Sequence, residues 1–458
     1  MKKLLLPLLF IFPLQLDAQR ATTYESLLQR SDQPNAYTSH IVIPKNDGSA
    51  FFGVTFRLDH DFIPFLRVRS GMNPDSENAQ YFAPVRMGVE INEGHVRESR
   101  RSSRNTQGRS VYRSTYQDTV FVDTFEETKS RYEHAQGFLT TTLQPGEYHY
   151  NLQLTRGESV REQPSQKRNI LVPEYAMLDS AGFTLMAEMN ISEQSAEGTL
   201  LNYGNSVLYG QDFDALFVLP QNSDQTYSLK MFRMRPGGSS EAESDPMYET
   251  TVEESDIFFG TNTTINKSGE ELHLSMDKTD SGVKFAKVSV PNSQFPNARY
   301  KLVLSTPNNP EVTERIINSQ WLDMPVSLLN IDVAIDMMRF ITDNDQLKEI
   351  RSGSGSQKEQ KFREFWEERD PSPDTEYNEL MTEYYSRIDQ TYQRFTSPQQ
   401  PGYETDQGQA LILYGEPLNI TRELPTNSPT QEIWEYRNRT LVFEATTGFG
   451  DFRLVEER

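Results

Sequence analysis

The sequence predicts a multidomain protein: two all-β domains of the immunoglobulin-like sandwich kind, followed by an α+β C-terminal domain. Short apolar runs broken by turn residues fill the first two-thirds of the chain, and helical apolar spacing begins after Trp321. The length of 458 residues also exceeds a typical domain of ~150 residues. We therefore expect domains at 19–165, 166–326 and 327–458.

Residues 1–18 have the layout of a secretory signal peptide. Two lysines precede an apolar run from Leu4 to Leu16, and the small residue Ala18 follows. This run is shorter than the ~20 apolar residues that span a bilayer. The sequence therefore predicts cleavage near Ala18 and an exported protein without a membrane span, located in the periplasm or outside the cell.

The first β domain is predicted from about seven short apolar runs between residues 39 and 155. Alternation is clearest after the turn sequence QPGE, where every second residue is apolar: Tyr148, Tyr150, Leu152 and Leu154. Because successive side chains of a strand point to opposite faces, one face of this strand is expected to be buried. Seven such strands at near-regular spacing are typical of an immunoglobulin-like sandwich.

The second β domain is predicted from a further set of strand-like runs between residues 170 and 304. Among them are GFTLMAEMNI, DALFVLP and ARYKLVLS, separated by loops rich in glycine, proline and acidic residues. Their length and turn content fit another antiparallel sandwich.

Helices are expected over residues 327–395 and a small sheet over 409–456. The stretch SLLNIDVAIDMMRFI is apolar over most of its circumference, which predicts a largely buried helix. An aromatic stripe from Tyr377 to Phe395 predicts another helix, with Asp374 or Thr375 as its N-cap. Helices followed by antiparallel strands indicate an α+β domain.

Composition excludes several kinds of chemistry. The chain has no cysteine, which removes disulfides, thiolate metal sites and cysteine nucleophiles. Its six histidines are scattered without the close pairs typical of metal sites, and none lies beyond His273. No Walker loop or dinucleotide fingerprint occurs. The sequence therefore predicts no metal site and no cofactor.

One segment is unusually basic for a chain of net charge −21. The three predicted domains carry net charges of −1, −10 and −11, and the first is near neutral because of an arginine-rich stretch that includes Arg100, Arg101 and Arg104. The stretch fits either a solvated loop or a contact patch for an acidic partner. Nucleic acid is excluded as a partner by the total charge and the export signal.

The end of the chain resembles a known bacterial family. The strings FWEERDPSPDTEYNELMTEYYSRI, PGYETDQGQALILYGEP and IWEY are similar to the domain named for its Gly-Trp-x-Thr-Asp motif, the GWxTD domain, from Phe362 onward. Here Tyr403 replaces the motif tryptophan, and Gln407 replaces the basic residue that commonly follows the motif. The resemblance implies an exported protein with β domains ahead of a helical and sheet module, and it implies no catalysis.

The GYETD motif itself has two interpretations. As a structural corner, Thr405 and Asp406 bond nearby backbone amides ahead of a predicted strand at 410–414, and Tyr403 packs against the helical stripe. As a catalytic loop, Asp406 pairs with another acid of this region for glycoside cleavage, which needs two carboxyl groups ~5–10 Å apart. The other acids near turns are Asp370, Glu379 and Glu416.

The function expected from these observations is that of a non-enzymatic interaction or scaffold protein of the bacterial envelope. Its expected partner is another envelope or extracellular protein, or a glycan. The alternative is a carboxylate-dependent hydrolase that acts on a cell-surface or extracellular polymer. No residue is assigned as catalytic, and the candidate binding residues are Tyr403, Thr405, Asp406, Arg100, Arg101 and Arg104.

Overall fold

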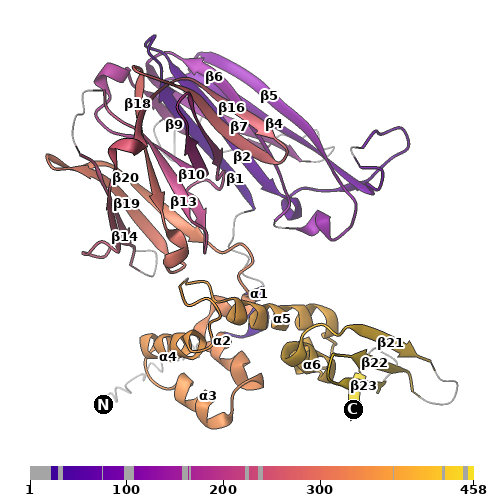
Figure 1. Cartoon of the computed structure of the whole chain (residues 1–458). Helices are drawn as coiled ribbons and strands as arrows, with labels where there is room; N and C mark the ends of the chain where they lie inside the picture. Colours follow the sequence, from indigo (N-terminus) through magenta and orange to yellow (C-terminus); the bar gives the residue numbers. More distant parts are fainter. Residues whose placement is uncertain are drawn as a thin grey trace, which may run out of the picture. The chain divides into compact units, whose positions relative to one another are not determined.

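The computed structural model is mostly β, with several sheets and a helical C-terminal region, as the sequence predicts (Figure 1). The chain divides into two compact units, which we call the β unit (residues 33–323 and 372–377) and the helical unit (the rest). The structure describes residues 22–28, 35–74, 76–96, 108–130, 132–156, 163–164, 167–221, 226–235, 241–374, 376–424, 429–446 and 452–458.

Two sheets form the first part of the β unit. Their strands are β1 (Ala36–Pro44), β2 (Ala50–Asp59), β3 (Leu66–Arg67), β4 (Tyr81–Glu93), β5 (Ser110–Val122), β6 (His134–Leu143), β7 (Gly146–Arg156), β8 (Gln163–Pro164) and β9 (Arg168–Val172). One sheet has the order β1-β2-β6; in the other, β3-β4-β7-β8 is extended by β5 on β4 and β9 on β7. Alternate residues of β2, β4 and β7 form one shared core, as expected for strands with one face turned inward. Tyr148, Tyr150 and Leu152 are buried in this core and Leu154 packs against it, but His149 on the other face is buried as well, so the predicted alternation holds only in part.

Two further sheets complete the β unit. Their strands are β10 (Gly182–Ile191), β11 (Ser195–Leu200), β12 (Ser206–Leu208), β13 (Phe213–Val218), β14 (Ser228–Arg233), β15 (Tyr248–Thr251), β16 (Ile257–Ser268), β17 (Glu271–Thr279), β18 (Val283–Val290), β19 (Arg299–Thr306) and β20 (Asn309–Gln320). The order β10-β11-β17-β16-β18-β13 closes on itself, and the second sheet has the order β12-β20-β19-β14-β15. Phe213, Ala215 and Phe217 of β13 face the core between these two sheets.

Strand β2 is buried on both faces. All ten of its residues are buried, although a strand with one solvated face would alternate. Phe52 and its alternate neighbours pack toward β4, whereas Phe51 joins Ile41, Ile43 and residues of the closed sheet in another core. The two predicted β domains therefore pack directly on each other through the sheet that contains β2. The boundary predicted at 165/166 stays a prediction.

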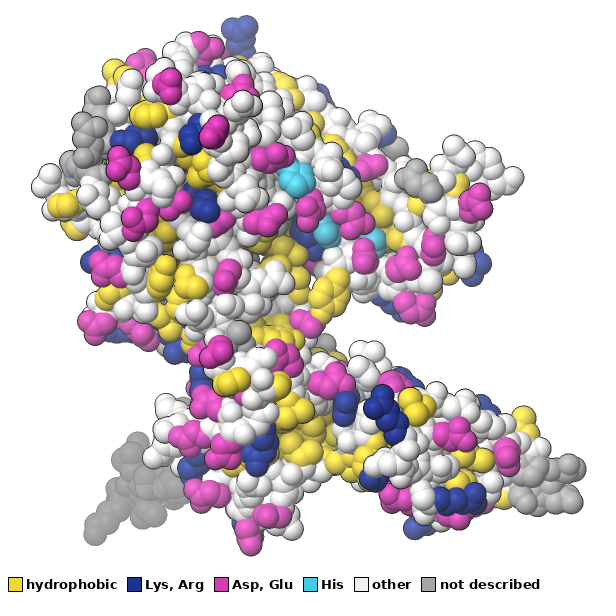
Figure 2. Space-filling model, viewed as in Figure 1, with side chains coloured by type: hydrophobic (Ala, Val, Ile, Leu, Met, Phe, Trp, Pro, Cys, Tyr) yellow, Lys and Arg dark blue, Asp and Glu magenta, His cyan; other side chains and the backbone are white. Residues whose placement is uncertain are grey.

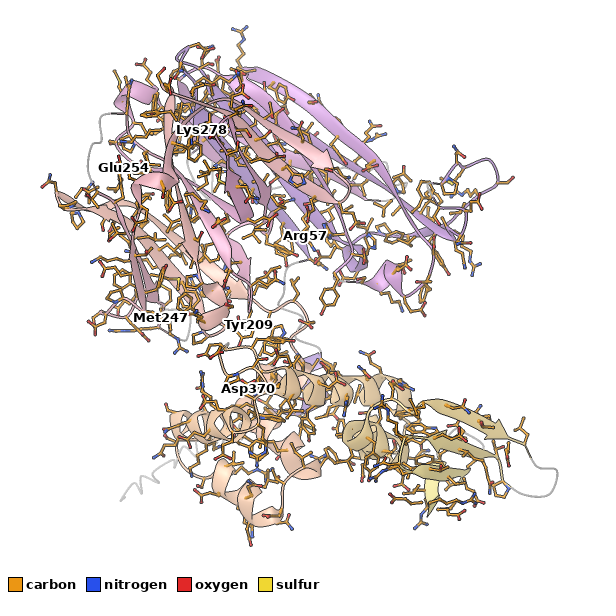
Figure 3. The ribbon with its side chains drawn as sticks, viewed as in Figure 1. Arg57, Tyr209, Met247, Glu254, Lys278 and Asp370 are labelled. Atoms are coloured by element: carbon orange, nitrogen blue, oxygen red, sulfur yellow. The ribbon has the colours of Figure 1, made fainter. Side chains whose placement is uncertain are left out.

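A short segment between two helices belongs to the β unit. Residues 372–377 pack there, where the Tyr209 hydroxyl donates to the carbonyl oxygen of Glu376 at 2.6 Å. The Tyr377 ring lies 5.5 Å from Trp321 and 6.0 Å from Tyr209, centroid to centroid (Tyr209 is labelled in Figure 3). Tyr377, expected in the helical stripe, therefore packs among aromatic rings of the β unit instead.

The helical unit combines six α-helices and three 3-10 helices with a four-stranded sheet among its described residues. Its elements are α1 (Tyr24–Leu28), the 3-10 helix η6 (Val326–Leu329), α2 (Ile331–Met337), the 3-10 helix η7 (Met338–Phe340), α3 (Asn344–Arg351), α4 (Gly355–Glu367), α5 (Glu379–Phe395), the 3-10 helix η8 (Gly402–Glu404), α6 (Asp406–Tyr414), β21 (Asn419–Glu423), β22 (Gln431–Glu435), β23 (Thr440–Ala445) and β24 (Phe452–Glu457). Tyr24 and Leu27 of α1 lie in its core, although the sequence predicts that they belong to the first β domain. Within the described ranges, every helix is too short or too polar to cross a membrane.

Two local predictions in this unit are wrong. Residues 406–414, expected to begin the sheet at 409 with a strand at 410–414, form helix α6, and the sheet starts at β21. A short apolar run fits a strand or a buried helix equally well, and the cap at Thr405 selects the helix. The N-cap of α5 is Asn378 rather than Asp374 or Thr375, because its side chain accepts the N–H of Met381 at 2.8 Å.

Candidate functional site

The motif aromatic residue is packed in the core of the helical unit. Tyr403 is 5% exposed, and its ring stacks on Tyr392 with 6.1 Å between centroids. The edge of Tyr24 meets the same ring at 5.5 Å, and the guanidinium of Arg339 lies 5.6 Å from its centroid. The Tyr403 hydroxyl donates to Glu25 at 2.9 Å. The ring is therefore enclosed by three helices and is not presented to a ligand.

The motif threonine and aspartate each hold backbone. Thr405 Oγ1 accepts the N–H of Gly408 at 3.0 Å, which caps α6, and donates to the carbonyl oxygen of Gly402 at 2.8 Å. Asp406 Oδ2 accepts the N–H of Leu454 at 2.7 Å, so it links the start of α6 to strand β24. Both side chains bond backbone groups, but the partner of Asp406 lies far along the chain instead of nearby.

The other acids considered for catalysis lie at three further helix ends. Asp370 follows α4 (Figure 3), Glu379 begins α5, and Glu416 follows α6, where it pairs with Arg394. Together with Asp406 they occupy four different positions in the helical unit. The arginines Arg100, Arg101 and Arg104 lie outside the described residues.

A half-buried carboxyl group joins α1 to the rest of the helical unit. Asp389 Oδ1 accepts the hydroxyl of Tyr24 at 2.7 Å, and its Oδ2 accepts the N–H of Val326 at 2.9 Å. Burial raises the pKa of Asp389 to about 6, because desolvation of the charged form outweighs the two hydrogen bonds that favour it.

This raised pKa predicts that Asp389 favours folding most at acidic pH. Between the ordinary value of 3.8 and about 6, the folded state binds a proton that the unfolded state has lost, so this contribution falls as pH rises through 6. Its size is at most about 3 kcal/mol. Urea unfolding at pH 4.5 and pH 7 should show wild type gaining stability relative to Asp389→Asn at the lower pH. A difference between the two proteins that stays constant with pH would contradict it.

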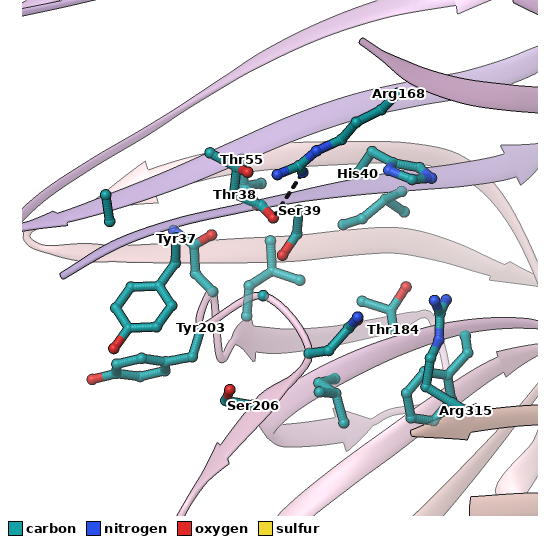
Figure 4. A pocket seen from close by; sticks show the side chains of 18 residues that line it. Tyr37, Thr38, Ser39, His40, Thr55, Arg168, Thr184, Tyr203, Ser206 and Arg315 are labelled. Carbon is teal, nitrogen blue, oxygen red and sulfur yellow. Dashed lines mark hydrogen bonds between the residues drawn. The ribbon is translucent and has the colours of Figure 1, made fainter. Parts of the chain in front are cut away.

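The β unit contains a polar cavity of about 500 Å³, which we call the arginine pocket (Figure 4). It lies between β1, the start of β10 and the loop 201–205, with Arg168 from β9 and Arg315 from β20 at its sides. Its volume falls in the ~300–1,000 Å³ range of ligand sites. The lining residues are Ala36, Tyr37, Thr38, Ser39, His40, Ile41, Thr55, Arg168, Phe183, Thr184, Leu185, Leu200, Asn202, Tyr203, Gly204, Asn205, Ser206 and Arg315.

The pocket is positively charged in an acidic protein. None of its 18 lining residues is acidic, although acidic side chains are scattered over the face drawn in Figure 2. Arg168 donates to the carbonyl oxygen of Thr38 at 3.3 Å, and among the described residues neither Arg168 nor Arg315 forms an ion pair. Burial lowers the pKa of Arg315, and its guanidinium lies 5.6 Å from the centroid of Phe183. The nearby Arg57 (Figure 3) is different, because it pairs with Asp59 at 3.3 Å.

The pKa of His40 reflects the positive charge of the pocket. His40 lines the cavity and is exposed to solvent, and its Nδ1 lies 3.2 Å from the Tyr150 hydroxyl. Desolvation, and then repulsion by Arg315 and Arg168, lowers the pKa of His40 to about 4. His40 is therefore neutral at pH 7, and the fixed charge of the pocket comes from the two arginines.

Sequence reasoning did not find this pocket. Arg168 and Arg315 are separated by 146 residues and stand singly in strands that show ordinary β patterns. No spacing rule connects them, because the fold alone brings β9 and β20 to the same cavity. The detectable signal was weaker: a positive charge within a strand, where β propensity favours apolar and β-branched residues.

Comparison with known proteins identifies the domain at the C-terminal end of the chain. The family model of the GWxTD domain matches residues 325–451, a span that starts well before Phe362, where the resemblance was first noted. No curated protein matches the chain. In this chain the motif reads Gly402-Tyr403-Glu404-Thr405-Asp406. The chain is therefore a GWxTD domain-containing protein, with its GWxTD domain at residues 325–451.

Proposed function

We propose that this protein is an exported, non-enzymatic binding or scaffold protein of the bacterial envelope, and that it binds its partner through the arginine pocket. The main support for this proposal is the pocket itself. It has a volume of about 500 Å³, two arginines without ion pairs among the described residues, and no acidic lining residue. Such a pocket has donors and fixed positive charge but no carboxylate to serve as an acid or base, which favours binding over hydrolysis.

The GWxTD corner supports a structural role in this proposal. Tyr403 is enclosed by rings, Thr405 caps a helix, and Asp406 accepts a backbone N–H from strand β24. Each of these side chains therefore already has a structural contact. The hydrolase alternative assigns catalysis to Asp406, whereas its Oδ2 holds the backbone of strand β24, and we do not favour it.

The proposal retains the immunoglobulin-like interpretation of the β regions. In support, the first region places two antiparallel sheets over one shared core, which is the arrangement of such sandwiches. The second region also has two sheets over a core, but it adds a closed strand order and a parallel β12·β20 pair. The arginine-rich stretch at Arg100, Arg101 and Arg104 is retained as a second contact patch, for an acidic partner.

The pocket is tested by filling it. Purified protein is incubated with a panel of bacterial envelope polysaccharides and envelope proteins, and binding is compared for wild type, Thr184→Trp and Glu188→Trp. Thr184 lines the pocket, whereas Glu188 is exposed on the same strand and is the matched control. Thr184→Trp should weaken binding at least tenfold, and Glu188→Trp should bind as wild type does.

Three outcomes would overturn the proposal. In the first, no envelope polymer or protein binds. In the second, Thr184→Trp binds as well as the control while circular dichroism shows both folded. In the third, a polysaccharide is cleaved by wild type but not by a folded Asp406→Asn variant, which would establish the hydrolase instead.

A further inference from the structure

The geometry points to a saccharide unit that carries a carboxylate, of the uronic acid type, as the ligand of the arginine pocket. This inference rests on the proposed function, because it names the chemical class that the binding site takes. Its anionic group would lie between Arg315 and Arg168, and its hydroxyl groups would lie against the polar wall formed by β1, the start of β10 and the loop 201–205.

The two arginines supply the anion recognition. Figure 4 shows the guanidinium of Arg315 directed across the cavity toward the side that holds His40 and Arg168. Arg168 bonds the carbonyl oxygen of Thr38 and the Tyr150 hydroxyl, which fixes its position and leaves further N–H donors. Both arginines are exposed to solvent and have no acidic partner among the described residues, so a bound anion gains charge-assisted hydrogen bonds without breaking an ion pair. A planar guanidinium matches a carboxylate through two parallel hydrogen bonds.

The rest of the wall fits a sugar better than a bare ion. Hydroxyl and amide groups surround the cavity from several elements: Thr38, Ser39, Thr184, Asn205 and Ser206. Sugars present many hydroxyl groups that both donate and accept hydrogen bonds, so a wall of hydroxyl and amide groups suits them. A volume of about 500 Å³ is also larger than phosphate or sulfate requires.

Binding of an acidic sugar can be followed through the pKa of His40, without a mutation. Its ring is packed by β1, β2 and β7, and the titratable or charged groups that face it are Tyr150, Arg168 and Arg315. Desolvation and then repulsion by the two arginines lower the pKa of His40 from 6.5 to about 4, and a carboxylate between the arginines offsets the second of these causes. The pKa should therefore rise when the acidic sugar binds and stay unchanged with a neutral sugar. By linkage, the acidic sugar should bind more tightly as pH falls toward that raised value.

The experiment uses the full chain and three defined probes: tetragalacturonate, neutral maltotetraose and inorganic phosphate. Calorimetry gives the affinities for wild type, Arg315→Gln and Arg299→Gln. Arg299 is exposed on the neighbouring strand β19 and does not line the pocket. Arg299→Gln therefore removes the same charge as Arg315→Gln, but outside the pocket, and serves as the control. Tetragalacturonate should bind at least tenfold more tightly than the other probes, and Arg315→Gln alone should remove that preference. A proton NMR titration of His40 should show its pKa rising only with tetragalacturonate.

The outcomes separate this inference from the proposed function. Equal binding of the acidic and neutral tetrasaccharides, unchanged by Arg315→Gln, overturns the ligand class but leaves a binding protein. Phosphate that binds as tightly as tetragalacturonate shows recognition of the anion alone and overturns the saccharide assignment. If none of these probes binds while an envelope protein binds at Thr184, the inference fails and the proposed function stands.

Discussion

Replacing Gly402 with alanine should destabilise the helical unit by about 3 kcal/mol. A Cβ atom at this position would overlap the carbonyl oxygen of Thr391 in α5 and lie 2.9 Å from the backbone nitrogen of Thr396. Both neighbours are backbone atoms, so no side-chain rotation relieves the contact, and α5 must move away from η8. Urea unfolding followed by tryptophan fluorescence measures the loss, since Trp366 and Trp434 both lie in this unit.

The control for this prediction is a glycine with free space around it. A Cβ atom at Gly355, the first residue of α4, has no neighbour within 4 Å. Gly355→Ala should therefore change the free energy of unfolding by no more than ~0.5 kcal/mol. Equal unfolding midpoints for Gly402→Ala and Gly355→Ala would show that the close approach of η8 to α5 is not what the motif glycine provides.

Replacing Tyr24 with alanine should cost about 3–5 kcal/mol, the range for truncating a large buried ring. The residue is only 2% exposed, and its ring lies 5.0 Å from Tyr392 and 5.5 Å from Tyr403. Loss of Tyr24 also removes the hydroxyl that donates a hydrogen bond to Asp389 Oδ1. Thermal unfolding of the full chain should then show an earlier transition for the helical unit.

Tyr24→Phe separates packing from hydrogen bonding at this site. The ring contacts remain and only the bond to Asp389 is lost, so we expect a cost of about 1–3 kcal/mol. If Tyr24→Ala and Tyr24→Phe unfold at the same temperature, the hydroxyl rather than the ring stabilises the docked α1 helix. If both variants unfold at the same temperature as wild type, α1 contributes nothing to the stability of the helical unit.

The general architecture could be predicted from the sequence because periodicity is a local signal. The strand ending at Arg156 and the helix around Ile335 both follow from which neighbouring residues are apolar. Helix α6 could not be distinguished in this way, since ALILY is apolar at every position that periodicity would test. Its identity depends on one hydrogen bond, from Gly408 N–H to Thr405, that a sequence pattern does not report.

The candidate sites show the same division between local and distant information. Thr405 was expected to bond a nearby amide, and it does, because its partner is three residues away. The partner of Asp406 is 48 residues away, and the two arginines of the pocket come from strands of different sheets. Such pairs depend on how sheets stack, which is decided by the whole set of apolar contacts. The docking of Tyr24 near the C-terminal part of the chain was missed for the same reason.

The double burial of β2 limits how this chain is divided for experiments. Phe51, Ile41 and Ile43 share a core with residues beyond 165, including Tyr175, Met186 and Leu216. A fragment that stops at residue 165 would present this apolar sheet face to water, and such faces promote aggregation. Expression trials that cut the protein at its sequence-predicted domain boundary should therefore give inclusion bodies, whereas a fragment that runs through β20 keeps the face covered.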